Sequence, residues 1–517
     1  MSQAKSSTLR QLLVQAEETF SSQDAFRYKV KGSNEEGKKN VEIEQKTYQQ
    51  LRRDSEKLSA LLETLSEKGS HAAIIGATSY SWVVSYFGIV NSGRVAVPLD
   101  ALLPEADICE LLNRADVEIL IFDGSKSNVA EAAKATCPGL KYLISMEGEF
   151  SVEEAGKTGL SLWKELEKQE AGYDYQPQPE DLATIMFTSG TTGKSKGVML
   201  THRNLAENAT CLDMGFDHGT VVMSVLPIHH AYCLSMDILK TLSLGSVICI
   251  NDYLMRVAKN IKLFEPEMIL MVPLMIETLV KKLEEAAWVP APLIKAKVFG
   301  KQFKSICSGG AYLNPAYIDT FAKFGITIYQ GYGMTECAPV ISSNYTGNYK
   351  AGSVGKLMPN CEAKVVDEEL WVRGSSVMQG YYKMPQETAE TLEDGWLKTG
   401  DLGYVDEDGF VFLTGRKKNL IITPNGENVS PEEIENKLGE HRLVQEVLVR
   451  EKEGVIEAEI FPDYEYARKK KVKDIRETLQ SIIDKYNKEA PLYKRVYALK
   501  VRETEFEKNT TRKIKRF

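Results

Sequence analysis

Residues 188–197 read Thr188-Ser189-Gly190-Thr191-Thr192-Gly193-Lys194-Ser195-Lys196-Gly197. This stretch contains three glycines, five hydroxyl side chains and two lysines. Glycine lets backbone N–H groups approach a polyanion closely, hydroxyls can donate to phosphate oxygens, and lysines supply counter-charge. The composition therefore predicts a loop that binds the phosphates of a nucleotide.

The flanks of this loop decide which kind of nucleotide site it can be. Residues 183–187 have the pattern of a strand. Residues 197–202 form a short run that contains β-branched side chains and has no helical pattern. A Walker loop opens on a glycine and leads into a helix whose N-terminus faces the phosphates. Here Thr188 stands in place of that glycine, and a second strand is expected after the loop. The strand–loop–strand pattern argues against a Walker loop; the other alternative is a glycine loop with a purely structural role.

Composition predicts a soluble protein of more than one domain. The chain has 517 residues, of which 43% are apolar and 26% are charged. It has no apolar run long enough for a membrane-spanning helix, and its start lacks the apolar core of a signal peptide. The eight cysteines include no Cys-x-x-Cys pair, which predicts reduced thiols, a cytoplasmic location and no zinc site. The net charge of −8 argues against nucleic-acid binding.

The order of predicted elements changes twice along the chain. Strand-like runs alternate with helical patterns up to about residue 352, which predicts α/β architecture with largely parallel sheets. Short, turn-linked strands at about 352–415 predict a small β-barrel or sandwich. Beyond Gly415, strands at 444–450, 455–461 and 496–501 combine with helices at 431–438 and 474–486 in a further unit.

Four other segments carry chemistry-bearing residues at the ends of predicted strands, where α/β folds place ligands. They are Leu226-Pro227-Ile228-His229-His230, Ser308-Gly309-Gly310-Ala311, Gln330-Gly331-Tyr332-Gly333-Met334-Thr335-Glu336, and Gly395-Trp396-Leu397-Lys398-Thr399-Gly400-Asp401, which precedes Gly415-Arg416-Lys417-Lys418.

Together with the 188–197 loop and Lys513, these segments resemble the adenylate-forming superfamily of acyl-CoA synthetases, luciferases and peptide-synthetase adenylation domains. The resemblance covers the chain from about residue 47 to its end. It implies an α/β fold: a large N-terminal domain (1–417) of two mainly parallel αβ layers with a β-barrel part at about 352–415, and a small mobile α+β lid domain (418–517). It also implies that a carboxylate and ATP form an acyl-adenylate and pyrophosphate, and that the acyl group then passes to a thiol.

The resemblance assigns the nucleotide site residue by residue. Thr188, Ser189, Gly190, Thr191, Thr192, Gly193 and Lys196 would hold the β- and γ-phosphates. Gly309, Gly310 and Ala311 would lie flat against adenine, with Tyr332 on its other face and Gly333 beside it. Thr335 would bind the α-phosphate, and Glu336 would ligate Mg²⁺. Asp401 would accept the ribose hydroxyls, and Arg416 would steady the ribose and phosphate end.

The resemblance also implies that the C-terminal domain acts in both half-reactions, with different residues at the site in each. Lys513 would bridge the substrate carboxylate and the α-phosphate as negative charge builds up. Its segment departs from the family at Glu507, Asn509 and Arg512, and a basic tail is the alternative reading. Lys418 matches the family's hinge, about which the lid would rotate. After this rotation, Gly426 would line the CoA tunnel and leave room for pantetheine.

The acid is predicted to be a fatty acid of medium to long chain. Residues 229–235 contain no acidic side chain that could hold an α-ammonium group, and His230 matches a family histidine beside the carboxylate. Segments such as 424–433 resemble bacterial long-chain acyl-CoA synthetases most closely. Tyr232, Leu234, Met236 and Leu239 are candidate walls of the acyl pocket. CoA is the expected acceptor; the alternatives are the phosphopantetheine arm of an acyl carrier protein, or activation of an aryl or other non-amino acid.

Overall fold

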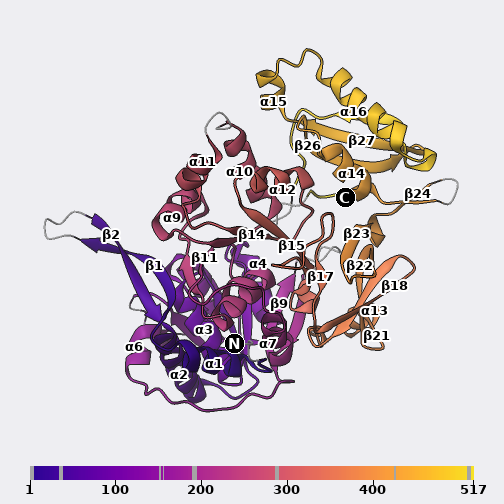
Figure 1. The fold of residues 1–517 in the computed structure, drawn as a ribbon. Helices are drawn as coiled ribbons and strands as arrows, with labels where there is room; N and C mark the ends of the chain where they lie inside the picture. Colours follow the sequence, from indigo (N-terminus) through magenta and orange to yellow (C-terminus); the bar gives the residue numbers. More distant parts are fainter. Residues whose placement is uncertain are drawn as a thin grey trace.

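The computed structural model describes residues 5–33, 39–148, 150, 153–154, 157–188, 195–285, 290–423, 427–508 and 514–516. Two large sheets, each of nine strands, form the body of the molecule (Figure 1). In both, a central parallel block is flanked by antiparallel strands, as the alternating sequence pattern predicts.

The first sheet has the order β17-β16-β15-β14-β13-β11-β12-β1-β2. Its strands are β17 (Lys356–Leu357), β16 (Val340–Ser343), β15 (Thr327–Gly333), β14 (Ser305–Ser308), β13 (Met268–Met271), β11 (Val221–Ser224), β12 (Val247–Ile250), β1 (Asp24–Ser33) and β2 (Lys39–Thr47).

The second sheet has the order β20-β10-β9-β4-β3-β5-β6-β8-β7. Its strands are β20 (Gly380–Tyr381), β10 (Lys196–Thr201), β9 (Leu182–Thr188), β4 (Val95–Leu99), β3 (His71–Ile75), β5 (Val117–Phe122), β6 (Tyr142–Ser145), β8 (Lys157–Ser161) and β7 (Glu153–Glu154).

Helices between the two sheets share one continuous hydrophobic core with them. The central helix, α3 (Tyr80–Asn91), is buried at eleven of its twelve residues, as expected for a helix covered on all sides. Side-chain caps fix where its neighbours begin: Thr47 and Thr201 each form a capping box with the residue three positions on. The helices of this layer are α1 (Leu9–Phe20), α2 (Tyr48–Leu65), α3 (Tyr80–Asn91), α6 (Leu162–Glu167), α7 (His202–Thr210) and α8 (Thr241–Ser243).

Further helices cover the outer faces of the sheets. A second apolar cluster joins the second sheet to α4 (Glu105–Arg114) and α5 (Ser127–Thr136). On the first sheet the covering helices are α9 (Val257–Phe264), α10 (Pro273–Glu285), α11 (Ala291–Val298) and α12 (Pro315–Ala322). In the part of the chain that the structure describes, no helix has both the length and the apolar composition that crossing a membrane requires.

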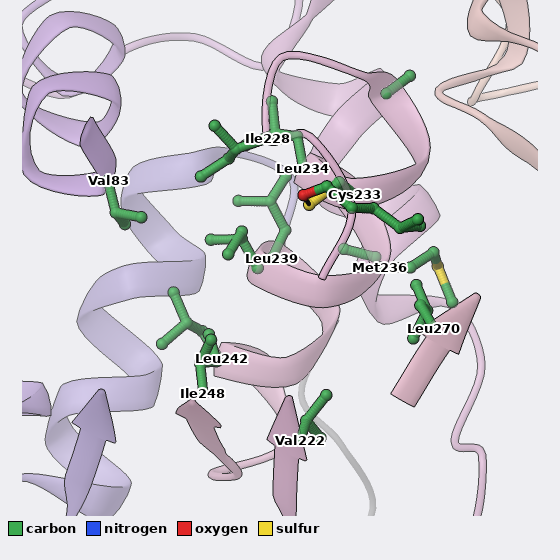
Figure 2. Close-up of a cluster of buried hydrophobic side chains, with 14 of the residues drawn as sticks. Val83, Val222, Ile228, Cys233, Leu234, Met236, Leu239, Leu242, Ile248 and Leu270 are labelled. Carbon is green, nitrogen blue, oxygen red and sulfur yellow. Dashed lines mark hydrogen bonds between the residues drawn. The ribbon is translucent and has the colours of Figure 1, made fainter. Parts of the chain in front are cut away.

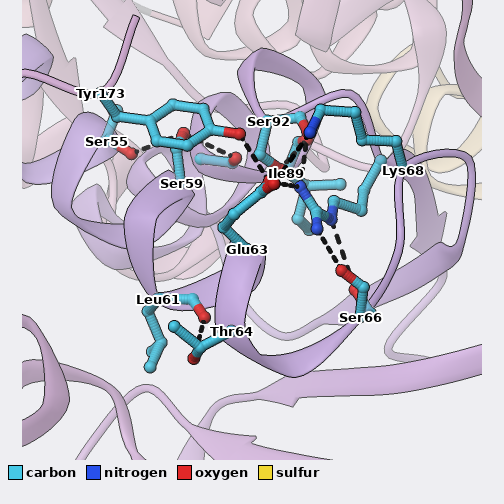
Figure 3. A network of polar contacts seen from close by, with 12 residues as sticks. Ser55, Ser59, Leu61, Glu63, Thr64, Ser66, Lys68, Ile89, Ser92 and Tyr173 are labelled. Carbon is cyan, nitrogen blue, oxygen red and sulfur yellow. Dashed lines mark hydrogen bonds and ion pairs between the residues drawn. The ribbon is translucent and has the colours of Figure 1, made fainter. Parts of the chain in front are cut away.

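A polar network joins the end of α2 to the start of β4 (Figure 3). The guanidinium of Arg94 is 1% exposed and donates to Glu63 at 2.7 Å and to the carbonyl of Ser92 at 2.6 Å. Lys68 and Tyr173 also bond the Glu63 carboxylate, and these hydrogen bonds, with that of Arg94, lower its pKa to about 2. A buried cation is tolerated here because each side of it has a hydrogen-bonding partner.

The region predicted as a β-barrel or sandwich is a five-stranded antiparallel sheet of order β18-β19-β22-β21, with β23 pairing with β22. Among the described residues its outer strands do not pair with one another, so the sheet is open rather than closed. The expected β-barrel part at about 352–415 is therefore corrected to an open sheet: turn-linked short strands occur in both arrangements, and their spacing does not say which outer strands pair. The elements are β18 (Cys361–Val366), β19 (Glu369–Gly374), α13 (Pro385–Thr391), β21 (Leu392–Glu393), β22 (Trp396–Val405) and β23 (Val411–Arg416).

The C-terminal part forms a separate α+β unit with its own core, at the top of Figure 1. Its contacts with the body include packing of α14 against β23, a hydrogen bond from Asn314 to the carbonyl of Gly439 at 3.3 Å, and an approach of Lys281 to 3.7 Å from Asp463. Its elements are β24 (Ile421–Ile422), β25 (Asn428–Val429), α14 (Pro431–Gly439), β26 (Val444–Lys452), β27 (Val455–Pro462), α15 (Tyr464–Lys469), α16 (Ile475–Glu489) and β28 (Ala498–Val501).

Candidate active site

The glycine-rich loop lies between two antiparallel strands. Thr188 ends β9 and is paired across the sheet with Lys196, the first residue of β10. The predicted strand–loop–strand geometry is confirmed, and it differs from a Walker loop because β10, not a helix, follows. Arg114 donates to the carbonyl of Ser195 at 2.6 Å, which fixes the exit of the loop. Ser189, Gly190, Thr191, Thr192 and Gly193 lie outside the described residues.

Lys196 and Glu336 meet at one tyrosine. The Lys196 ammonium lies 4.7 Å from the centroid of the Tyr381 ring, and the Tyr381 hydroxyl donates to Oε1 of Glu336 at 2.8 Å. Burial and the neighbouring carboxylate both raise the pKa of Tyr381, so its hydroxyl stays protonated and donates. Oε2 of Glu336 has no hydrogen-bond partner within the described ranges. Sequence reasoning missed Tyr381, which lies 45 residues from Glu336 and in no motif of its own.

A second cluster forms where β22 and β23 pair. Asp401 is directly opposite Arg416, whose Nε lies 2.7 Å from Oδ1 of Asp401. The hydroxyl of Tyr332, at the end of β15, donates to Oδ2 at 2.7 Å. The structure therefore brings together three side chains that the sequence spreads over 85 positions, and both carboxylate oxygens already have protein partners.

The turn after β14 leaves little space above its backbone. A Cβ atom on Gly309 would lie 3.2 Å from the Tyr232 ring and 3.5 Å from the carbonyl oxygen of Gly331. Gly310 has φ = +85°, a conformation that favours glycine. Gly310 and Ala311 are exposed at the carboxyl edge of the first sheet. The turn therefore offers a flat backbone surface, as a bound aromatic base requires.

The segment after β15 turns back tightly. A Cβ atom on Gly333 would lie 1.9 Å from the carbonyl oxygen of Pro339, so this position excludes a side chain. Thr335 and Glu336 follow in a short 3₁₀ helix (Thr335–Cys337), and both are half-buried. The carbonyl of Glu336 accepts from the backbone N–H of Met378, which ties this turn to the segment that leads into β20, the strand that carries Tyr381.

Two adjacent histidines lie at the end of the loop after β11. Their ring centroids are 4.2 Å apart, and Nε2 of His229 lies 3.7 Å from Oδ2 of Asp100. Burial is the main cause that lowers both pKa values, to about 4 for His229, so both rings are neutral at pH 7. His230 is the exposed member of the pair, and its ring is the one accessible to a ligand.

The model of AMP-binding enzymes matches residues 26–382, and the model of their C-terminal domain matches residues 418–516. The chain belongs to the AMP-binding enzyme family. It is 29% identical to the long-chain-fatty-acid–CoA ligase of Escherichia coli O157:H7 over 435 residues, covering 74% of this chain and 73% of that protein. It is 35% identical to the 4-coumarate–CoA ligase-like 6 protein of Arabidopsis thaliana over 308 residues, or 54% and 52% of the two chains.

Among solved structures, that of the anthranilate CoA ligase AuaEII in complex with anthranoyl-AMP is similar at a TM-score of 0.81 and 22% identity, covering 98% of this chain and 95% of that one. This likeness confirms the expected fold of a large N-terminal and a smaller C-terminal domain. Family membership and the relatives support the class of AMP-forming acid–CoA ligases.

The candidate acyl-pocket residues of this AMP-binding enzyme lie on two faces of one helix. Over Cys233–Lys240 the helix is π-wound, and Leu234 and Leu239 are fully buried on the side of Val83 (Figure 2). Met236 lies on the other side, beside Leu270 (Figure 2), and Tyr232, the residue before the helix, lies four positions earlier in the chain. Residues two positions apart in a helix point in different directions, so the set predicted from sequence could not share one pocket wall.

A narrow cavity with room for about one water molecule lies on the Met236 side of this helix. Its walls are mainly apolar and come from the helix and from three strands of the first sheet. Lys240 contributes a buried ammonium that donates to the carbonyl of Leu212, and burial lowers its pKa to about 8. The wall includes Val222, Met236, Lys240, Met268, Leu270 and Cys307.

Asp237 is a buried acid that sequence reasoning passed over. The acid-free segment 229–235 ends two residues before it. Asp237 accepts from the Ser224 hydroxyl at 3.0 Å and lies 3.6 Å from the Cys233 sulfur, while burial raises its pKa to about 7. Such an acid is held within the core and is a poor counter-charge for an ammonium group, so it does not restore an amino-acid substrate.

The residues assigned to the mobile lid are described in part. Lys418 is exposed, and its pKa is lowered by partial burial of its ammonium group and by the nearby cations Arg416 and Arg516. Lys513 and Gly426 lie outside the described residues. The ends of the segment that carries Lys513 lie side by side, because Lys508 and Ile514 form a β-bridge.

Proposed function

We propose that this AMP-binding enzyme activates a medium- to long-chain fatty acid with ATP and transfers the acyl group from acyl-AMP to CoA. One observation carries this choice: Tyr232 packs on Gly309 at the turn proposed to bind adenine, and Met236, about one helical turn on, lines an apolar cavity. A chain that enters past Tyr232 would gain about 0.8 kcal/mol for each buried CH₂ group. The name of the Escherichia coli relative is consistent with this substrate.

We assign the nucleotide to the region formed by two side-chain clusters, that of Lys196, Tyr381 and Glu336 and that of Tyr332, Asp401 and Arg416. Thr188, Lys196 and residues 189–193 would bind the phosphates, and Thr335 would bind the α-phosphate. Gly309, Gly310, Ala311, Tyr332 and Gly333 would hold the adenine, and Asp401 with Arg416 would hold the ribose. The short distances from Asp401 to Tyr332 and Arg416 support a preorganised ribose site. His230 would lie beside the substrate carboxylate.

Glu336 fits a magnesium ligand because one of its oxygens has no protein partner in the described part of the chain, and carboxylate oxygens suit this hard cation. When bound, Mg²⁺ would neutralise charge on the triphosphate. Tyr381 would hold the carboxylate at a fixed angle through its other oxygen. The cation–π contact with Lys196 would keep that ring in place next to the phosphate loop.

We expect Tyr381→Phe to lower pyrophosphate release by about tenfold to a hundredfold, because a hydrogen bond to a charged group is worth about 1.5–3 kcal/mol. The Mg²⁺ concentration for half-maximal rate should rise, since Glu336 would lose its positioning partner. Steady-state kinetics at graded Mg²⁺ measure both effects. Tyr382→Phe is the matched control, because the Tyr382 hydroxyl bonds Asp116 instead. Equal losses in the two variants would contradict this role.

We also propose that the chain divides into a body (1–417) and a lid (418–517) that rotates about Lys418. The separate apolar core of the C-terminal unit supports this division. Lys513 would serve the first half-reaction, and Gly426 would line the CoA tunnel in the second. The cytoplasmic location expected from the cysteines stays a prediction; all eight are unpaired thiols in the structure.

A second candidate substrate is an aromatic acid. The flat Tyr232 ring at Gly309 would also pack against a short, flat acyl group, which would fill less of the space beyond Met236 than a long chain would. The similarity to the Arabidopsis 4-coumarate–CoA ligase-like protein is consistent with this alternative. The acceptor alternative is the phosphopantetheine arm of an acyl carrier protein.

Pyrophosphate release measured over straight-chain acids of graded length and over benzoic and cinnamic acids tests the proposal. Each acid is assayed with CoA, with an acyl carrier protein, and with neither. We expect the specificity constant to rise with chain length and the thioester to form on CoA. A maximum among the aromatic acids would favour the second candidate. A response to no acid would contradict both.

A further inference from the structure

The loop between β12 and α9 exposes three apolar side chains in succession. Tyr253 and Leu254 are each 64% exposed, and Met255 is 99% exposed. They form the apolar tip of this loop, and Leu254 and Met255 belong to a short 3₁₀ helix (Leu254–Arg256) that leads into α9. Contiguous exposed apolar side chains on a surface mark a contact with a partner or a membrane.

A polar network braces the base of this tip. Asp252 lies 2.7 Å from the Lys29 ammonium and 2.8 Å from the Arg256 guanidinium, and it accepts from the buried amide of Asn260 at 2.7 Å. The same amide donates to Asn251 at 2.6 Å. Arg256 also lies 5.0 Å from the Tyr253 ring centroid. These contacts hold the three apolar residues outward in a defined arrangement.

Basic side chains lie beside the apolar tip. Lys259 and Lys262 are three positions apart in α9 and share a face of that helix, and Met255 precedes them in the adjoining 3₁₀ helix. Lys259 and Lys262 are exposed, and within the described ranges no carboxylate lies within ion-pair distance of either. The acidic groups nearby are Asp252, which is paired with two cations, and the exposed Glu265 at the end of α9. This face is therefore locally cationic, although the chain carries a net charge of −8.

The tip lies at the edge of the sheet that carries the proposed acid site. β11 and β12 are parallel neighbours, so both end at this edge. The backbone N–H of Asn251 donates to the carbonyl of Ser224 at 3.1 Å, which joins the base of the tip to the loop that leads to His229 and His230. A partner surface bound at the tip would therefore lie at the same edge of the sheet as these histidines, where we place the acid.

We propose that Tyr253, Leu254 and Met255, with Arg256, Lys259 and Lys262, form a docking surface for the headgroup region of an anionic lipid membrane. Apolar side chains that enter the interface beside lysines that pair with lipid phosphates are the combination that peripheral membrane binding uses. The protein would dock without spanning the bilayer. An apolar acid dissolved in the membrane would then reach the enzyme at the edge where we place its binding site.

Sedimentation with phosphatidylcholine vesicles, with and without 30% phosphatidylglycerol, tests this proposal without requiring turnover. We expect wild-type protein to bind the anionic vesicles at least about tenfold more tightly than the neutral ones. Lys259→Gln together with Lys262→Gln should weaken anionic binding about 25-fold, at roughly fivefold for each charge. Leu254→Ser together with Met255→Ser should weaken it at least about tenfold.

Two control variants carry the same kinds of substitution at other places on the surface. Leu492 is 68% exposed and, like Leu254, lies in a three-residue 3₁₀ helix, so Leu492→Ser should bind as wild type does. Lys470→Gln with Lys473→Gln changes another exposed basic segment and should also leave binding unchanged. Melting temperatures identify any variant that misfolds.

The proposal is overturned if wild-type protein ignores anionic vesicles, or if the tip variants bind them as wild type does. Loss of binding in the Lys470/Lys473 pair instead would move docking to the C-terminal domain. Light scattering on the wild type and on the Leu254/Met255 variant tests whether a second copy of the chain binds the tip instead of a membrane. A dimer that becomes monomeric in the variant would show that the tip is an interface between copies. Because vesicle binding is read without substrate, a failure here leaves the proposed reaction untouched.

Discussion

Lys513→Ala should slow acyl-adenylate formation by about 10²–10³-fold and leave thioester formation from supplied acyl-AMP nearly unchanged. A group that meets the negative charge developing at the α-phosphate stabilises the transition state of the first step alone, and removing such a group costs about 2.7–4 kcal/mol. After lid rotation the same lysine would lie away from the reacting atoms, so the second step should not need it. Pyrophosphate release and thioester yield measure the two steps separately.

The surroundings of this lysine supply the control. The β-bridge between Lys508 and Ile514 fixes the ends of its segment, Lys508 bonds Glu446 and Glu505, and Arg516 pairs with Glu435. Lys515, two residues away, is exposed and lies 3.9 Å from Glu507. Lys515→Ala should therefore have little effect on either step. If Lys513→Ala impairs both steps equally, the role that we assign to Lys513 is wrong.

Asp401→Ala should lower kcat/KM for ATP by about 10²–10³-fold. The carboxylate accepts from Tyr332 and pairs with Arg416, each at 2.7 Å, and each interaction with a charged group is worth about 1.5–3 kcal/mol. Without it, the buried Tyr332 hydroxyl and the Arg416 guanidinium would both lose their positions in the proposed nucleotide site.

The effect should appear in the dependence on ATP and not in that on the acid. Kinetics at graded ATP and graded acid separate the two. Asp408→Ala is the control, because Asp408 lies in the turn that links β22 to β23 and its side chain is 71% exposed. Equal changes for both substrates would indicate a general loss of structure, and no change would remove Asp401 from the nucleotide site.

Much of the fold could be predicted from the sequence because its signals are local. The β-branched runs on both sides of the 188–197 loop predicted β9 and β10, and the alternation of strands and helices predicted largely parallel sheets; that there are two was an expectation from the family resemblance. The closure of the 352–415 sheet could not be predicted, since it depends on which outer strands pair, and turn spacing does not encode that.

The candidate site could be predicted where its residues belong to sequence motifs. It could not be predicted where a contact joins a motif to a residue outside any motif. The pairing of Asp401 with Arg416 follows from two neighbouring strands that both carry motif residues. The contact of Tyr381 with Glu336 depends on β20 joining the edge of the second sheet, which no local pattern reveals. Leu234 was grouped with Met236 because both are apolar, yet helical geometry turns them to opposite sides.

The path of one oxygen atom tests the central claim most directly. A fatty acid labelled with ¹⁸O in its carboxylate is incubated with the enzyme, ATP and CoA, and the AMP is examined by mass spectrometry. Attack of the carboxylate on the α-phosphate followed by thiol attack on the acyl carbon leaves one labelled oxygen in AMP. We predict AMP that carries a single ¹⁸O; unlabelled AMP, or label found in inorganic phosphate with ADP as the product, would contradict the acyl-adenylate route.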